Sequence, residues 1–262
     1  MEISEKIWDD YIKRLNAIDT EAAERMRRFL AERDWWSSEQ AQQETIDFAF
    51  LLAQEYGLAA GALTAEMYDA IIDLSYRRYP QDMPKKRLPD AEIAPTATYT
   101  ETATTIYGAA KHQNPEVVAS AVSRLAKQVS VDTMAQNAIR DGAQWAWIPR
   151  GDTCAFCIML ASNGWQNAGK SALKNGHAQH VHANCDCTYA VRFTDKMDVA
   201  GYDPQAYLDF CNSGSGTPED KLNHMRRIMY EQNKEKINEQ KRSAYAKRQE
   251  RNAPQAEEEN IT

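Results

Sequence analysis

The chain has 262 residues, of which 43% are hydrophobic and 26% charged, and a formal net charge of −7. This length and apolar content allow one sizeable core and one or two domains, whereas the acidic balance argues against a surface made wholly for nucleic acid. The first residues lack a basic region followed by an apolar stretch, and no apolar run reaches about eighteen residues, so we expect neither a signal peptide nor a membrane partner.

The first part of the chain has the period of amphipathic helices. From Ile7 to Phe29, apolar residues recur every three or four positions, which predicts one long helix or two in line. Ser37 with Gln40 forms a capping-box pattern before a second apolar stretch, and Gly57 is a plausible end for that helix. The sequence therefore predicts at least two helices before residue 58.

A third helix is predicted from about residue 65 to 79, where Pro80 ends it. Four prolines and a basic cluster make residues 80–95 an exposed connection, and the threonine-rich residues 96–105 are ambiguous between strand and helix. Asn114 followed by Pro115 is typical of a helix start. That helix can extend to Asp141 unless the β-branched and short polar residues at 130–133 interrupt it.

After Gly142 the composition changes to one rich in Gly, Cys, His and Asn. In residues 188–193, Tyr189, Val191 and Phe193 occupy every second position, which predicts a strand that can pair with residues 145–148. Farther on, Thr217 before Pro218 predicts the start of a polar helix that runs to about residue 251.

The predicted fold class is mainly α, with a small zinc-stapled β-element and a projecting C-terminal helix. We predict a helical domain over residues 1–142, a zinc-type module over 143–195 and a C-terminal helical segment over 196–252. The acidic residues 253–262 are expected to be a disordered tail.

Four of the five cysteines, together with one histidine, have the spacing of zinc ligands. The pattern is Cys154-x-x-Cys157, then His182-x-x-Cys185-x-Cys187, which supplies thiolate and imidazole ligands in two short clusters. Cys154, Cys157 and His182 are the first three choices, with Cys185 or Cys187 as the fourth. The total of five cysteines is odd and four of them crowd into residues 154–187, which argues against a framework of paired disulfides.

A simpler interpretation is that these cysteines are reduced, buried small hydrophobic residues. We favour a metal because isolated core cysteines have no reason to cluster with a histidine at ligand spacing. His177 and His180 lie in a polar loop and are treated as solvent-exposed histidines. Cys211 stands alone in the sequence and is expected to be an ordinary thiol.

The segment from Pro149 to Gly164, which contains Asp152, Cys154 and Cys157, followed by residues 182–187, resembles phage minor head proteins of the Mu F-like head morphogenesis family. The specific part of the resemblance covers about forty residues. It departs from the family at Ala183 and Asp186, where many relatives have proline and arginine, and this puts an anion contact there in doubt.

The resemblance implies a structural component of the virion, present in the host cytoplasm during assembly, that meets portal, capsid or scaffold proteins and carries out no reaction. The alternative is a zinc-dependent nucleic-acid-binding protein or nuclease. A zinc deaminase is disfavoured because no histidine here is followed by glutamate two residues later. For a nuclease, the suggestive residues His180, His182 and Asn184 overlap the predicted ligands.

The C-terminal helix is basic on an acidic protein. Residues 221–251 hold ten Lys or Arg against four Glu, enough for contact with packaged DNA if the cations act together. The candidate set is Arg226, Arg227, Lys234, Lys241, Arg242 and Arg248. A solvated helix or a protein-binding helix explains the same charge pattern.

Overall fold

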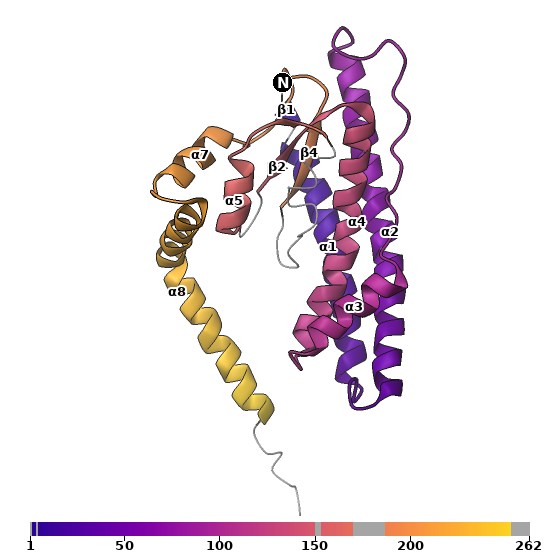
Figure 1. The fold of residues 1–262 in the computed structure, drawn as a ribbon, viewed down its shortest axis with the longest axis vertical. Coiled ribbons are helices and arrows are strands. Elements are labelled where there is room, and N and C mark those ends of the chain that lie inside the picture. Colours follow the sequence, from indigo (N-terminus) through magenta and orange to yellow (C-terminus); the bar gives the residue numbers. More distant parts are fainter. Residues whose placement is uncertain (1, 4, 150–152, 170–186, 253–262) are drawn as a thin grey trace, which may run out of the picture. The chain divides into compact units, whose positions relative to one another are not determined.

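The computed structural model describes residues 2–3, 5–149, 153–169 and 187–252 (Figure 1). The protein is mainly helical, with 67% of its residues in helices and a small sheet, which confirms the predicted class. Met1–Asp209 form one compact unit and Phe210–Thr262 a second. The zinc staple, the projection of the C-terminal helix and the predicted domain boundaries stay predictions.

The first helix, α1 (Glu5–Ala31), is continuous, so the prediction of one long helix is confirmed. Its buried face includes Tyr11, Leu15 and Met26 from the predicted stripe, together with Trp8. Ile7, at the start of that stripe, is instead 51% exposed.

The second helix, α2 (Glu39–Arg78), runs through the region where the sequence predicted two helices. It begins at Ser38, whose side chain accepts a hydrogen bond from the Ala41 amide, one residue after the predicted cap. Gly57 does not end the helix, and this prediction is wrong. A Cβ atom at Gly57 would lie 2.9 Å from Val129 Cγ2, so the glycine allows a close approach between helices. Pro80 is confirmed as the stop, since the helix ends at Arg78.

By length and composition alone, α2 is long and apolar enough to cross a membrane, and it is the one such helix in the described part of the chain. Half of its most apolar window is buried inside the protein, as is usual for a core helix. This pattern is weak evidence for a membrane span.

Residues 80–98, here called the strap, connect α2 to α3 (Tyr99–Ala110), with turns and bends up to residue 86 and no helix or strand from 87 to 98. The predicted exposed connection is confirmed, since most of its residues up to 95 are exposed, and side chains of α2 and of α4 (Pro115–Asp141) bind its backbone. The Ala91 amide donates to Asp69 Oδ1 at 2.8 Å, and the Ala94 amide donates to Thr133 Oγ1 at 3.0 Å. Further bonds involve Gln54, Tyr76, Gln136, Asn137 and Arg140.

The threonine-rich stretch forms helix α3, which begins with a capping box between Thr98 and Glu101. The start of α4 is as predicted: Asn114 caps the helix by accepting a hydrogen bond from the Glu116 amide at 3.0 Å. The helix is not interrupted at 130–133, because those residues face the buried side. Gly142, in left-handed conformation with φ 68°, closes it.

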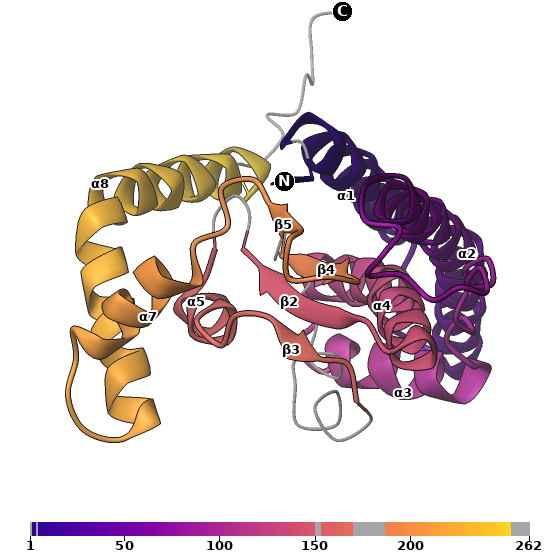
Figure 2. The same cartoon turned by 90° about the horizontal axis from the view of Figure 1, so that it is seen from above.

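Three short strands form an antiparallel sheet in the order β3 (Gln166–Asn167), β2 (Gln144–Ile148), β4 (Thr188–Arg192). Trp145 lies opposite Val191 and Trp147 opposite Tyr189, so the predicted strand pairing is confirmed. Figure 2 shows β4 on the side of α4 and α5 (Ala155–Ala161) on the side of β2. A parallel pair, β1 (Glu2–Ile3) with β5 (Asp198–Val199), lies beyond β4.

Two hydrophobic clusters fill the first unit. The smaller one joins α1, α2, α3 and α4 at the end where α1 passes into α2. The larger one contains residues of α1, α2 and α4 together with residues of β2, β4 and α5, so apolar contacts continue across residue 142.

Helix α7 (Pro204–Asn212) ends the first unit and begins the second. Helix α8 (Pro218–Asn252) starts where it was predicted, with Thr217 and Asp220 forming reciprocal hydrogen bonds across its first turn. The predicted acidic tail lies outside the described residues.

Candidate metal centre

Cys154 and Cys157, here called the knuckle, occupy the start of α5. Cys154 is the residue that precedes the helix, and its carbonyl accepts a hydrogen bond from the Ile158 amide at 3.1 Å. The first helical turn brings Cys157 back toward it, so the two Sγ atoms lie 3.5 Å apart. Cys157 is buried and Cys154 is half-buried.

The distance between these sulfur atoms fits a shared metal ion. Two thiolates bound to one tetrahedral zinc at about 2.3 Å lie about 3.8 Å from each other. Disulfide-bonded sulfurs lie about 2.05 Å apart. The observed separation of 3.5 Å excludes a disulfide, and it fits a hydrogen bond between two reduced thiols as well as a shared metal ion.

Cys187 reaches the same end of the sheet from the opposite direction in the chain. It directly precedes β4, whose first residue, Thr188, pairs with Ile148 at the end of β2. Its Sγ atom lies 4.0 Å from Thr153 Oγ1, beside the knuckle. Cys187 is fully buried and belongs to the same hydrophobic cluster as Cys157. The antiparallel pairing thus brings together two cysteine segments that are distant in sequence.

The remaining predicted ligands, His182 and Cys185, lie outside the described residues, as do His177 and His180. Within the described ranges, no group of three or more His, Cys, Asp or Glu side chains could hold a metal ion. The complete ligand set therefore stays a prediction. Cys211, which was predicted to be an ordinary thiol, is buried in α7.

Aromatic side chains fix the sheet behind the knuckle. The Tyr189 ring contacts Trp145 and Trp147 edge to face, at centroid distances of 4.6 and 4.7 Å. Tyr11 of α1 is buried and its hydroxyl lies 2.9 Å from Thr64 Oγ1. Burial raises the pKa of Tyr11 to about 12, so the phenol stays neutral at physiological pH.

A polar cluster lies at the end of the sheet opposite the knuckle, where Gln144 pairs with Arg192. The Arg192 guanidinium lies over the Trp165 ring, 4.6 Å from its centroid, and Nε donates to Gln144 Oε1 at 2.8 Å. The Trp165 indole donates to Asp198 Oδ1 at 3.0 Å. Burial lowers the pKa of Arg192.

Sequence reasoning did not find this cluster. Its four members come from β2, β4, β5 and the residue before β3, and no fixed spacing connects them. Without the strand register, an isolated Arg or Trp carries no signal. The cluster ties strands to one another, and its groups are hydrogen-bonded within the protein, so it has the character of a structural element.

Chemically, the arrangement suits a closed structural site. The knuckle is supplied by the first turn of a helix and Cys187 by the start of a strand, and the described thiols at this end are buried or half-buried. Catalytic zinc sites keep an open position for water or substrate.

No curated protein and no solved structure matches this chain. A family model described as VG15 protein matches residues 2–212, which includes the bundle, the sheet and the knuckle. The match supports the expectation of a phage protein at this coarser level. The chain therefore belongs to the VG15 protein family, a family of viral gene products.

Proposed function

We propose that the protein is a minor capsid, or head morphogenesis, protein of a tailed bacteriophage that acts in procapsid assembly near the portal. The observation that carries the proposal is that Cys187 lies beside Thr153, the residue before the knuckle, so that two distant cysteine segments reach one end of the sheet. These residues belong to the segment that resembles Mu F-like proteins. Membership of a viral family over residues 2–212 supports the same proposal.

The proposal includes one structural zinc ion per chain. Its ligands are Cys154, Cys157, His182 and either Cys185 or Cys187. Zinc would cross-link the start of α5 to the segment before β4 and so close the intervening loop. The burial of Cys157 and Cys187 supports this structural role over a catalytic one.

In this proposal the protein is not an enzyme. It resides in the virion, and in the host cytoplasm during assembly, and its partners are portal, capsid or scaffold proteins. The mainly helical first unit and its cross-linked sheet would serve as a rigid docking body.

Mass spectrometry of purified procapsids and virions, combined with disruption of the gene, tests this role. We expect a few copies per particle, and we expect loss of the protein to leave major capsid protein unassembled or in aberrant heads. Normal heads without the protein would contradict the proposal. Metal-dependent cleavage of DNA by the purified protein would instead favour the nuclease alternative.

Elemental analysis tests the metal separately. Purified protein should carry about one zinc per chain. Cys157→Ser should lose the metal, whereas Cys211→Ser, which removes another buried thiol, should keep it. Fully folded protein without metal, with a melting temperature that a chelator leaves unchanged, would refute the zinc site and leave the assembly role to its own test.

A further inference from the structure

The end of the bundle where α1 passes into α2 presents aromatic side chains on its surface. We call this end the tip and define it by Phe29, Asp34, Trp35, Trp36, Glu44, Phe48 and Tyr107. The Phe29 and Phe48 rings stack at 4.3 Å, and Trp36 contacts Tyr107 at 5.4 Å. The tryptophans are only partly buried and Tyr107 is 48% exposed. Phe29, Trp35, Trp36 and Phe48 are half-buried against the smaller hydrophobic cluster and Tyr107 is exposed. Partly exposed aromatic side chains of this kind are enriched at interaction sites.

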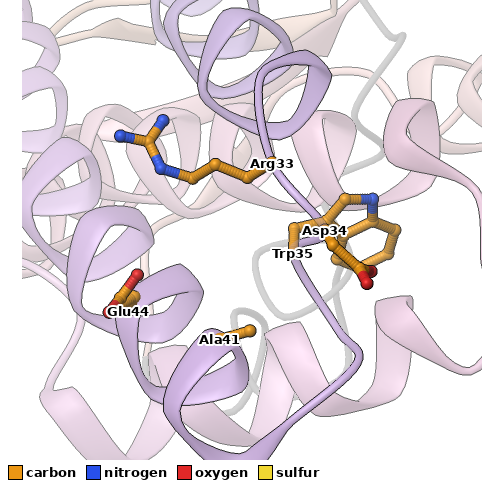
Figure 3. Close-up of a pocket in the computed structure, with 5 residues that line it drawn as sticks. All are labelled: Arg33, Asp34, Trp35, Ala41 and Glu44. Carbon is orange, nitrogen blue, oxygen red and sulfur yellow. The ribbon is translucent and has the colours of Figure 1, made fainter.

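A hollow of about 230 Å³ opens in the tip. Its lining residues are Arg33, Asp34, Trp35, Ala41 and Glu44 (Figure 3). Pockets that bind small molecules usually measure about 300 Å³ or more. The hollow is therefore better matched to one side chain of a protein partner than to a metabolite.

The charge of the tip indicates which charge its partner carries. Residues 32–47 contain five exposed carboxylates and a single cation, Arg33. The Arg33 guanidinium lies over the Phe29 ring at 4.2 Å and donates to the Phe29 carbonyl at 3.3 Å. Arg33 also lies 3.7 Å from Glu32, so it offsets one of the five carboxylates and negative charge dominates the surface. A partner with cations and aromatic rings would match it.

Helix α8 carries such a surface. Five exposed residues on it are separated by three, four, seven and four positions, a spacing that places them on one helix face. We call this set the α8 stripe: Arg227, Tyr230, Lys234, Lys241 and Tyr245. The two tyrosines are 40% and 64% exposed.

Mixed charge on α8 lowers the attraction of this face for any acidic ligand. Glu231, Glu235 and Glu239 are spaced by four residues and lie next to the stripe, and Lys234 already contacts Glu231 at 3.1 Å. These carboxylates would repel the phosphates of DNA and the carboxylates of the tip alike, so charge does not choose between the two ligands. The two tyrosines of the stripe favour the tip, which offers aromatic rings to contact.

We propose that the α8 stripe of one copy of this chain docks on the tip of another copy. The two surfaces lie on separate compact units and are complementary in charge and in aromatic content. Such an interface is heterologous, because it joins two different surfaces. In a dimer, one copy keeps an unoccupied tip and the other an unoccupied stripe, so further copies can add until the assembly closes into a ring or continues as a filament. The inference is independent of the head-assembly role, and α8 lies beyond the residues matched by the family.

The described structure offers one other cationic surface, at the opposite end of α2. Its exposed cations are Arg77, Arg78, Lys85 and Lys86. None of the large hydrophobic residues that are exposed in the described chain lies between residues 77 and 87. This end matches the charge of the tip but has only half-buried rings, those of Tyr76 and Tyr79, and no exposed one, so it is the alternative that the second control variant tests.

Sedimentation of full-length variants tests the proposal. The tip variant is Asp34→Asn with Glu44→Gln, and the stripe variant is Arg227→Gln with Lys241→Gln. We expect each to weaken self-association by about tenfold, since each exposed ion pair contributes only a few-fold. Association of the unaltered protein should also weaken as salt rises.

Each variant has a control with the same change in charge. Asp10→Asn with Glu66→Gln removes two exposed carboxylates away from the tip, and Arg78→Gln with Lys85→Gln removes two cations from the far end of α2. Both controls should associate as the unaltered protein does. A loss of association confined to the second control would assign the tip's partner to that end and overturn the proposal.

Mixing the two variants distinguishes docking between copies from docking within one chain. The tip variant keeps an intact stripe and the stripe variant keeps an intact tip, so a mixture should form a heterodimer that neither forms alone. A mixture that stays monomeric would overturn the proposal, as would an unaltered protein that is monomeric at all concentrations. A stripe variant that loses binding to duplex DNA but associates normally would assign the stripe to nucleic acid instead.

Discussion

The bundle and the three-stranded sheet lie in one compact unit but are held together in different ways. In the bundle, small residues let backbones approach closely: a Cβ atom at Gly61 would lie 2.5 Å from Ile93 Cγ2 and 3.0 Å from Val129 Cγ1. In the sheet, the spaces are filled by large rings, with Tyr189 in contact with both Trp145 and Trp147.

The difference has a consequence for how each region is stabilised. Long helices with continuous apolar faces can pack without any further link. A sheet of two five-residue strands and one of two residues has little area of its own, and such small elements usually need a disulfide, a metal or a larger neighbour. The sheet has the bundle as its neighbour and, in our proposal, zinc as its link.

The largest expected effect comes from removing that link. Cys157→Ser should destabilise residues 145–195 by several kcal/mol, because structural zinc contributes its binding energy to folding. Hydrogen exchange should then show faster amide exchange in β2 and β4, with α2 and α4 largely protected.

Loss of protection throughout the first unit would contradict this expectation. It would show that the shared hydrophobic cluster makes bundle and sheet one cooperative body, and that the predicted boundary near Gly142 separates no independent domains.

A smaller effect is expected from crowding the bundle itself. Gly61→Val should destabilise the protein by about 1–3 kcal/mol, because the added carbons meet Ile93 and Val129 in a filled space. Gly108→Val is the matched control: nothing lies within 4 Å of a Cβ there, so the stability should change by less than about 0.5 kcal/mol. Equal urea midpoints for the two variants would mean that the strap moves to accommodate the added carbons, and that close packing at Gly61 contributes little to the stability of the bundle.

The smallest effect concerns one helix start, and it depends on pH. Glu101 accepts hydrogen bonds from the Thr98 amide and hydroxyl at 2.7 and 2.8 Å, and these bonds lower the pKa of its carboxyl below 4.5. A lowered pKa stabilises the fold above the usual pKa, and the stabilisation disappears as the pH falls through the lowered value.

Thr98→Ala should therefore cost about 1 kcal/mol near neutral pH and less near pH 3. Thermal unfolding of both proteins at the two pH values measures the difference. A penalty that is the same at both would show that the threonine acts through packing and not through the ionised Glu101.

The sequence predicted those features that depend on neighbours in the chain. Asn114 starts α4 and Pro80 follows the end of α2 because capping and ring geometry act locally. The pairing of β2 with β4 also followed from alternation, since Tyr189 and Val191 had to find an apolar partner strand.

Features that depend on distant residues were not predictable. Gly57 predicts the end of a helix because glycine is common at helix C-termini. The residue that it contacts, Val129, is more than seventy positions away in the sequence, so the contact is not visible in the local pattern. The cluster of Arg192 with Trp165 required the strand register. At the candidate metal centre, spacing identified the knuckle, but the choice between Cys185 and Cys187 needs the fold of a segment outside the described residues.

The hydrogen bonds to the strap constrain its length more than its amino-acid sequence. Side chains of α2 and α4 bind mainly its backbone: the amides of Ala91, Glu92 and Ala94 donate to Asp69, Asn137 and Thr133. Any residue other than proline supplies an amide, so most exposed positions of the strap can change in evolution without losing these bonds. The insertion or deletion of one residue would move every later amide of the strap away from its acceptor. The strap should thus vary freely in sequence while keeping its length, in contrast to most surface connections.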